Sequence, residues 1–160
     1  MSTRSQLRFI EYGNITANIY RHSDGYPEGF IPDFLEFLHW YTGNPAPRSL
    51  NDLSYASANW IYWSKMQLQH YDSGGMQYSK LGYGILPDNA IQPDVEYLYQ
   101  FDGEVLMVSE HLWGGDISGW ESVPWAFTGN LLQVRRKFAA EIIPLKVGGD
   151  LRVGVRGGKN

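Results

Sequence analysis

The most informative absence is cysteine, of which the 160 residues contain none. This excludes a disulfide framework, a thiol nucleophile and any zinc site with thiolate ligands. Long apolar runs are also missing, so we expect no membrane partner. The polar residues 1–8 lack the apolar segment of a secretory signal. We therefore predict a cytoplasmic protein that forms a single domain over residues 1–160.

Charged side chains are scarce as well, at 19% of the sequence, where about a quarter is usual. Aromatic side chains are abundant instead: they make up 15% of the residues and include 6 Trp and 11 Tyr. Aromatic residues dominate protein cores, and Tyr and Trp are also enriched where surfaces recognise ligands or partners. The excess therefore has two interpretations, an aromatic core and a recognition surface.

The charge is distributed unevenly along the chain, whose formal net charge is −4. The Gly-rich segment 144–160 contains four basic side chains and one acidic side chain, a net charge of +3, so the preceding body carries −7. We expect this segment to be partly flexible, with a last strand over residues 151–155. Because the body is negative, we expect no specific nucleic-acid partner.

Two hairpins are predicted from turn residues between strand-forming segments. Gly13-Asn14 separates residues 7–12 from residues 15–21, and Asp102-Gly103 separates residues 95–101 from residues 104–109. Apolar spacing and end signals predict three helices, from about Pro32 to Gly43, from about Asn51 to Gln69 and from Leu131 to about Ile142. Residues 81–86 suggest a short strand, and residues 112–130 suggest an aromatic-rich loop.

Because strands and helices are segregated along the chain, we predict an α+β fold. The expected architecture is an antiparallel sheet built from two hairpins plus a short strand, with two to three helices on one face. Two hairpins leave open sheet edges that need cover, so we also expect a homo-oligomer.

The most distinctive segment is residues 22–29, with the sequence His-Ser-Asp-Gly-Tyr-Pro-Glu-Gly, between a predicted strand and a predicted helix. Free N–H groups at the start of a helix attract anions, and glycines let a phosphate approach the backbone. The segment lacks the glycine spacing and the final Lys-Ser/Thr of a P-loop. The alternative interpretation is a shaped turn, in which Gly, Pro and Asp serve geometry alone.

A second candidate is residues 59–65, Asn-Trp-Ile-Tyr-Trp-Ser-Lys, on the second predicted helix. An aromatic helix face beside Asn and Lys could stack a nucleobase and pair with a phosphate. The alternative is a helix that is buried nearly all round, with Trp60 and Trp63 in the core.

These two segments, together with residues 32–38 (PDFLEFL) and 81–85 (LGYGI), resemble blocks of uncharacterised small proteins of phages and prophages. The resemblance covers roughly residues 9–110. It implies a viral or mobile-element setting, in which the protein acts on host machinery or on a host defence signal. It implies no catalytic residues.

Our leading hypothesis is a non-enzymatic viral protein that sequesters a small anionic, nucleotide-type ligand and so counters host defence signalling. We expect neither a cofactor nor a metal, because the four His are far apart and no carboxylate-rich cluster is present. The predicted ligand-binding residues are His22, Asp24, Gly25, Tyr26, Gly29, Asn59, Trp60, Trp63, Lys65, Tyr83, Arg136 and Arg152.

Two alternatives remain open at this stage. The first is a protein–protein inhibitor or structural module that binds a host protein through Trp113, Trp120 and Trp125 of loop 112–130, because Trp makes good interface anchors. The second is a nucleotide hydrolase with His22 as the base.

Overall fold

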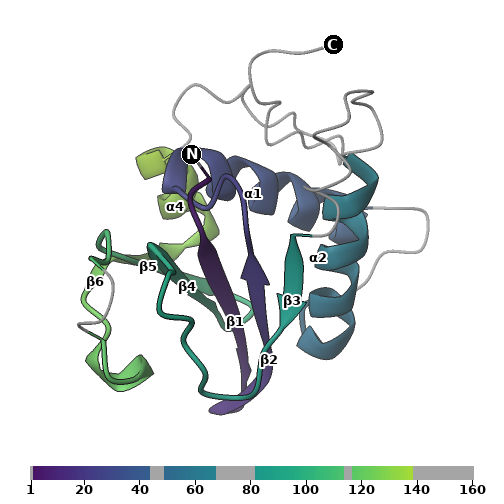
Figure 1. Cartoon of the computed structure of the whole chain (residues 1–160). Coiled ribbons are helices and arrows are strands. Elements are labelled where there is room, and N and C mark those ends of the chain that lie inside the picture. Colours follow the sequence, from purple (N-terminus) through teal and green to yellow (C-terminus); the bar gives the residue numbers. More distant parts are fainter. Residues whose placement is uncertain (1, 44–48, 68–81, 114–116, 139–160) are drawn as a thin grey trace.

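A computed structural model of the chain describes residues 2–43, 49–67, 82–113 and 117–138 (Figure 1). The α+β class is confirmed, and the described residues form a six-stranded sheet and three α-helices. In chain order the elements are β1 (Ser5–Glu11), β2 (Asn14–Arg21), α1 (Pro27–Gly43), α2 (Leu53–Gln67), β3 (Tyr83–Ile85), β4 (Tyr97–Phe101), β5 (Val105–Ser109), the 3₁₀ turn η2 (Trp120–Ser122), β6 (Trp125–Asn130) and α4 (Leu131–Phe138).

The sheet has the strand order β3-β2-β1-β4-β5-β6. The two predicted hairpins are present as β1–β2 and β4–β5, but they meet through a parallel pairing of β1 with β4, so the sheet is mixed. The remaining pairs are antiparallel. Part of the predicted loop 112–130 is also a strand, because Trp125–Asn130 pairs with β5 as β6. Its side chains alternate between half-buried and exposed positions up to Phe127, as strand geometry requires.

Both hairpin turns differ in detail from the prediction. In the first, the turn residues are Tyr12 and Gly13, one position earlier than expected, and both have positive φ angles of 53° and 77°. Positive φ at both central residues is the type I′ geometry that matches the twist of the flanking strands. In the second, the loop spans Asp102–Glu104, and the Asp102 carboxylate accepts hydrogen bonds from the amides of Glu104 and Val105.

All three helices pack on one face of the sheet (Figure 1). The core on this face is aromatic: the rings of Phe30 and Tyr99 stack with centroids 3.9 Å apart, and Phe34 packs edge-on against both Phe101 and Trp60. Burying each of these side chains contributes about 1.5–3 kcal/mol. Many of the abundant aromatic residues therefore lie in the core, where they pack α1 and α2 against β1 and β4.

The opposite face of the sheet carries a second, smaller core and a buried amide pair. The side chains of Gln6 and Asn18 hydrogen-bond to each other at 3.0 Å, and both donate to the carbonyl of Ala90. The Gln6 side-chain oxygen also accepts a hydrogen bond from the Gln92 amide at 2.7 Å. Because the segment between β3 and β4 supplies the remaining partners of these buried polar groups, they fix that segment across the second face.

Alkaline pH should destabilise this fold through Tyr99. Burial raises the pKa of the Tyr99 phenol well above its usual value, whereas the same phenol ionises at about pH 10 in the unfolded chain. The stability that this group contributes is present below about pH 10 and is lost as the pH rises further, by up to about 1.4 kcal/mol per pH unit.

Thermal unfolding between pH 8 and pH 11 checks this expectation. Tyr99→Phe should flatten the alkaline decline in Tm, although at neutral pH it costs stability because the Tyr99 hydroxyl donates to the Gly25 carbonyl at 2.7 Å. Tyr12→Phe, at an exposed turn residue, is the matched control and should leave the decline unchanged. Equal declines in the wild type and Tyr99→Phe would contradict the assignment.

Candidate recognition site

The predicted anion loop at residues 22–29 is shorter in the structure than in the prediction. Helix α1 begins at Pro27, so Pro27–Gly29 are helical and Pro32, which we expected in the first turn, lies inside the helix. Pro27 suits the first helical position because its fixed φ angle is helical and it has no N–H to leave unpaired. The loop proper is therefore residues 22–26, in which Asp24 has a positive φ angle of 54°.

The two glycines of this segment make close contacts with other parts of the protein. A Cβ atom at Gly25 would lie 2.6 Å from the Cβ of Ser5, and one at Gly29 would lie 2.9 Å from the Tyr26 ring. The Gly25 amide donates to the Thr3 carbonyl at 2.9 Å. Packing against the N-terminal strand therefore explains why residue 25 is a glycine without any need for a ligand. This agrees with the interpretation of the loop as a shaped turn.

Sequence reasoning missed Arg21, which lies between the loop and α2. Its Nε donates to the Ser23 carbonyl at 2.7 Å and its Nη2 contacts the Asp33 carboxylate at 2.9 Å. Its guanidinium carbon is 5.9 Å from the ring centres of both Phe30 and Trp60. Arg21 occupies an inward position two residues after the core residue Ile19, which is the sequence signal that could have identified it.

The buried side chains of Arg21 and Phe30 fill the space between the loop and the aromatic residues of α2. Trp60 is 1% exposed and packs on Phe30, and Trp63 is also buried, so neither indole presents an open face. Within the described part of the chain, the loop and Trp60 lie on either side of Arg21, and the burial of Trp60 and Trp63 leaves neither indole open to a ligand. The role of both indoles in ligand binding stays a prediction.

Of the other predicted ligand-binding residues, Tyr83 and His22 lie beside Arg21 and the loop, whereas Asn59 and Lys65 lie on α2 and Arg136 lies on α4. Tyr83 pairs with Arg21 across β2 and β3, and His22 lies within 3.4 Å of the hydroxyls of Ser2 and Tyr20. The Asn59 side chain donates to the Tyr55 carbonyl of its own helix, and Lys65 is half-buried at the last turn of α2. Arg136 is exposed on α4, and Arg152 lies outside the described residues, as does segment 144–160.

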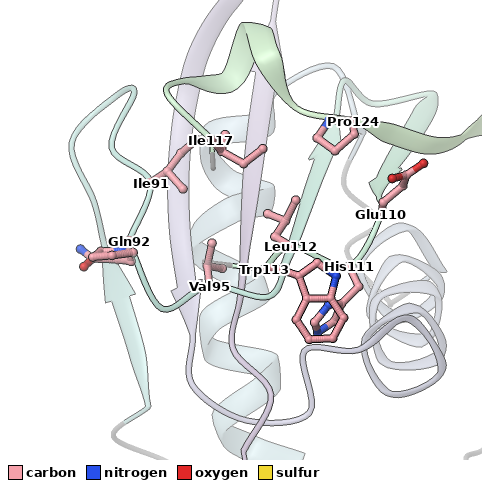
Figure 2. Close-up of a pocket in the computed structure, with 10 residues that line it drawn as sticks. Ile91, Gln92, Val95, Glu110, His111, Leu112, Trp113, Ile117 and Pro124 are labelled. Carbon is pink, nitrogen blue, oxygen red and sulfur yellow. The ribbon is translucent and has the colours of Figure 1, made fainter. Parts of the chain in front are cut away.

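A pocket of about 330 Å³ lies on the opposite face of the sheet (Figure 2). We call it the Trp113 pocket. Three chain segments build it: residues 91–95 before β4, residues 110–113 after β5, and residues 117–124 before β6. Its walls are mostly apolar, and its polar groups are few; the lining residues are Ile91, Gln92, Pro93, Val95, Glu110, His111, Leu112, Trp113, Ile117 and Pro124.

Trp113 and His111 form the mouth of this pocket, and their rings lie side by side in Figure 2. The ring centres are 4.3 Å apart in an edge-to-face arrangement, while Trp113 itself is 78% exposed. His111 is held from the other side, because its Nε2 is 3.3 Å from the Glu96 carboxylate and its ring packs edge-on against Tyr97. The exposed indole therefore rests on a fixed support.

The surroundings of this support are acidic. Burial, followed by the nearby carboxylates of Glu28 and Glu96, raises the pKa of Tyr97. Glu110 lines the pocket with an exposed side chain, whereas the charge of Asp94, which lies between the lining residues Pro93 and Val95, is balanced by an ion pair with Arg4 at 3.0 Å. An electronegative, aromatic mouth favours cationic and apolar groups and disfavours anions.

The Trp-rich loop proposed from the sequence divides into parts with different roles. Trp120 is buried, stacks on Trp125 and carries the Arg8 guanidinium 4.2 Å above its ring, so it is part of the second core. Trp113 is the loop tryptophan that projects into solvent. Residues 91–96 and His111 gave no local signal in the sequence, because the pocket forms only when distant segments meet.

Neither a known protein family, nor a curated protein, nor a solved structure is detectably similar to this chain. Over the described residues there is no group of three or more His, Asp or Glu side chains placed to hold a metal ion. In the same part of the chain, every helix falls short of the length and apolar character needed to cross a membrane.

The packing role of Gly25 is testable by substitution. Gly25→Ala forces its new methyl group against Ser5, so we expect a loss of about 1–3 kcal/mol in the free energy of unfolding. Gly84→Ala is the matched control, since the nearest atom to its added Cβ would be 3.8 Å away. Urea unfolding of both variants measures the difference, and an undiminished stability of Gly25→Ala would show that Gly25 is free to serve a ligand instead.

Proposed function

We propose that this chain is a binding protein that recognises a protein partner through the Trp113 pocket. The observation that carries the proposal is a largely exposed tryptophan at the mouth of a mainly apolar pocket, supported by a half-buried His–Glu pair. Tryptophans in such positions act as binding hot spots, because a partner removes a large apolar area from water at little cost in side-chain entropy.

The size and charge of the pocket indicate the kind of group that it takes. A volume of about 330 Å³ is at the small end of ligand sites, which suits an inserted side chain better than a whole nucleotide. The carboxylate of Glu110 and the face of Trp113 favour a neighbouring Lys or Arg on the partner, through charge attraction and a cation–π contact. We infer a partner segment with an apolar anchor beside a basic residue.

The resemblance to phage and prophage proteins supplies the setting of this proposal. In that setting the partner is a host protein and the chain acts in the host cytoplasm. The proposal takes up the interaction-module hypothesis from the sequence, with Trp113 as its anchor in place of all three loop tryptophans.

A small anionic ligand is the second candidate, and one observation favours it. Arg21 is only 8% exposed, and its buried Nη1 atom has no hydrogen-bond partner among the described residues. A buried N–H group that lacks a partner is costly, and a phosphate or carboxylate oxygen would supply one. The acidic neighbour Asp33 already neutralises Arg21, which makes this candidate the weaker one.

Selection from a random peptide library tests the protein-binding proposal. Peptides that bind the wild-type protein should be enriched in an aromatic or branched apolar residue next to Lys or Arg. Trp113→Ala should weaken their binding at least tenfold, which is about 1.4 kcal/mol. Leu132→Ala, at an exposed apolar residue on α4, is the control and should bind normally. Selected peptides that bind both variants equally well would place the recognition site elsewhere.

A panel of linear and cyclic nucleotides tests the second candidate by thermal unfolding. A nucleotide at 100 times its Kd should raise the free energy of unfolding by about 2.7 kcal/mol. Arg21→Met should abolish that gain, provided that circular dichroism shows the variant to be folded, whereas Lys137→Met, at an exposed residue of α4 that was not predicted to bind the ligand, should retain it. If no nucleotide shifts the wild-type protein, the anionic-ligand candidate fails.

A further inference from the structure

The outer edge of β2 is only partly covered. Strand β2 has eight residues, but β3 pairs only with Ile19, Tyr20 and Arg21. Beyond these pairs, a further backbone hydrogen bond to this edge runs from the Leu86 amide to the Asn18 carbonyl at 2.8 Å. Residues 14–17 of β2 therefore have no strand on their outer side within the described part of the chain. An uncovered edge of this kind presents unpaired N–H and C=O groups that can pair with another strand.

This edge also lacks the usual protection. No charged residue and no proline occurs between Glu11 and Arg21. Proteins that keep a sheet edge free normally place charges or prolines on it. The one protective feature here is the bulge that shifts the register between Phe9 and Ile10, which shortens the flat part of the edge without closing it.

A groove runs beside the open edge, between β2 and α2. Its volume is about 350 Å³, and α2 contributes mainly small side chains, including Ser54, Ser57 and Ala58. The strand side of the groove includes the apolar residues Ile15 and Ile85, of which Ile85 is 77% exposed, and the charged residue Asp88 lines the groove after β3. The outer face of α2 continues this surface with the exposed side chains of Tyr55, Tyr62 and Met66.

We propose that this edge and groove bind the same surface of a second copy of the chain, with the two β2 strands antiparallel about a two-fold axis. A two-fold axis places the residues nearest to it close to their own copies, and residues 12–20, which include the free edge, carry no charged side chain that would repel its copy. The open row of backbone donors and acceptors is complementary to itself in the antiparallel direction. Because the free edge is short, contacts from Ile85 and α2 supply much of the interface.

The proposed dimer would leave the Trp113 pocket of each copy accessible. The Trp113 pocket is formed by the segments around β4, β5 and β6, whereas the dimer contact uses β2, β3 and α2. Both pockets therefore remain open in the dimer, and a partner with two binding segments gains affinity by engaging both. The dimer itself does not depend on the proposed function of the pocket.

Sedimentation equilibrium of the full chain, combined with charge substitutions, tests this proposal. The wild-type protein should be dimeric, and Ile85→Lys should shift it to monomer with at least a tenfold weaker association, because the two-fold axis brings the new charges together. Leu132→Lys, which places the same charge on the exposed face of α4, should leave the dimer intact. A monomeric wild-type protein, or a dimer that Ile85→Lys does not weaken, would overturn the proposal.

The absence of cysteine allows a second, independent measurement. A single cysteine introduced as Thr16→Cys should be cross-linked efficiently to its own copy by a short bis-maleimide reagent, because residue 16 lies on the open edge near the proposed axis. Leu132→Cys should not be cross-linked at the same protein concentration. A Thr16→Cys protein that is folded and dimeric but not cross-linked would show that the copies meet through another surface.

Discussion

The burial of aromatic rings between the helices and the sheet is the constraint on which the rest of the structure depends. Phe30 stacks on Tyr99, and Trp60 packs against Phe30, Phe34 and Phe37, so α1 and α2 are fixed to the sheet through their largest side chains. Well-packed interiors of this kind leave no room for a ligand without a rearrangement. Among the described residues, the core beneath α1 and α2 is therefore filled, and the Trp113 pocket and the groove beside β2 lie outside it.

On the second face, polar contacts organise a surface that the apolar residues alone would not define. The amides of Gln6 and Asn18 hold the segment before β4, and the Leu112 amide donates to the Glu96 carbonyl at 2.8 Å, which holds the segment after β5. Glu96 also pairs with His111, on which Trp113 rests. A pocket with rigid walls loses little entropy when a partner binds, so the proposed recognition follows from this polar framework.

Local chemistry in the sequence was enough to predict the α+β class, both hairpins and the positions of the helices, because turn residues and apolar spacing act over a few residues. The parallel pairing of β1 with β4 escaped prediction, since it joins segments about ninety residues apart and no local pattern encodes it. The sequence pattern predicts a loop at Trp125–Asn130, because Trp and Gly residues obscure the alternation of this short strand. The candidate site was harder still: Arg21 and the Trp113 pocket become visible only when distant segments are brought together, and the indole of Trp60 proved to be interior.

The central claim is that the helix-face indoles are shielded while Trp113 alone among the loop tryptophans stands in solvent, and fluorescence quenching tests it most directly. Acrylamide quenching of the wild-type protein and of Trp113→Phe compares the accessible emission before and after that indole is removed. Trp113→Phe should lose the largest share of the quenchable emission, while Trp60 and Trp63 remain shielded. An unchanged quenchable fraction in Trp113→Phe would contradict it, because the accessible indoles would then lie elsewhere.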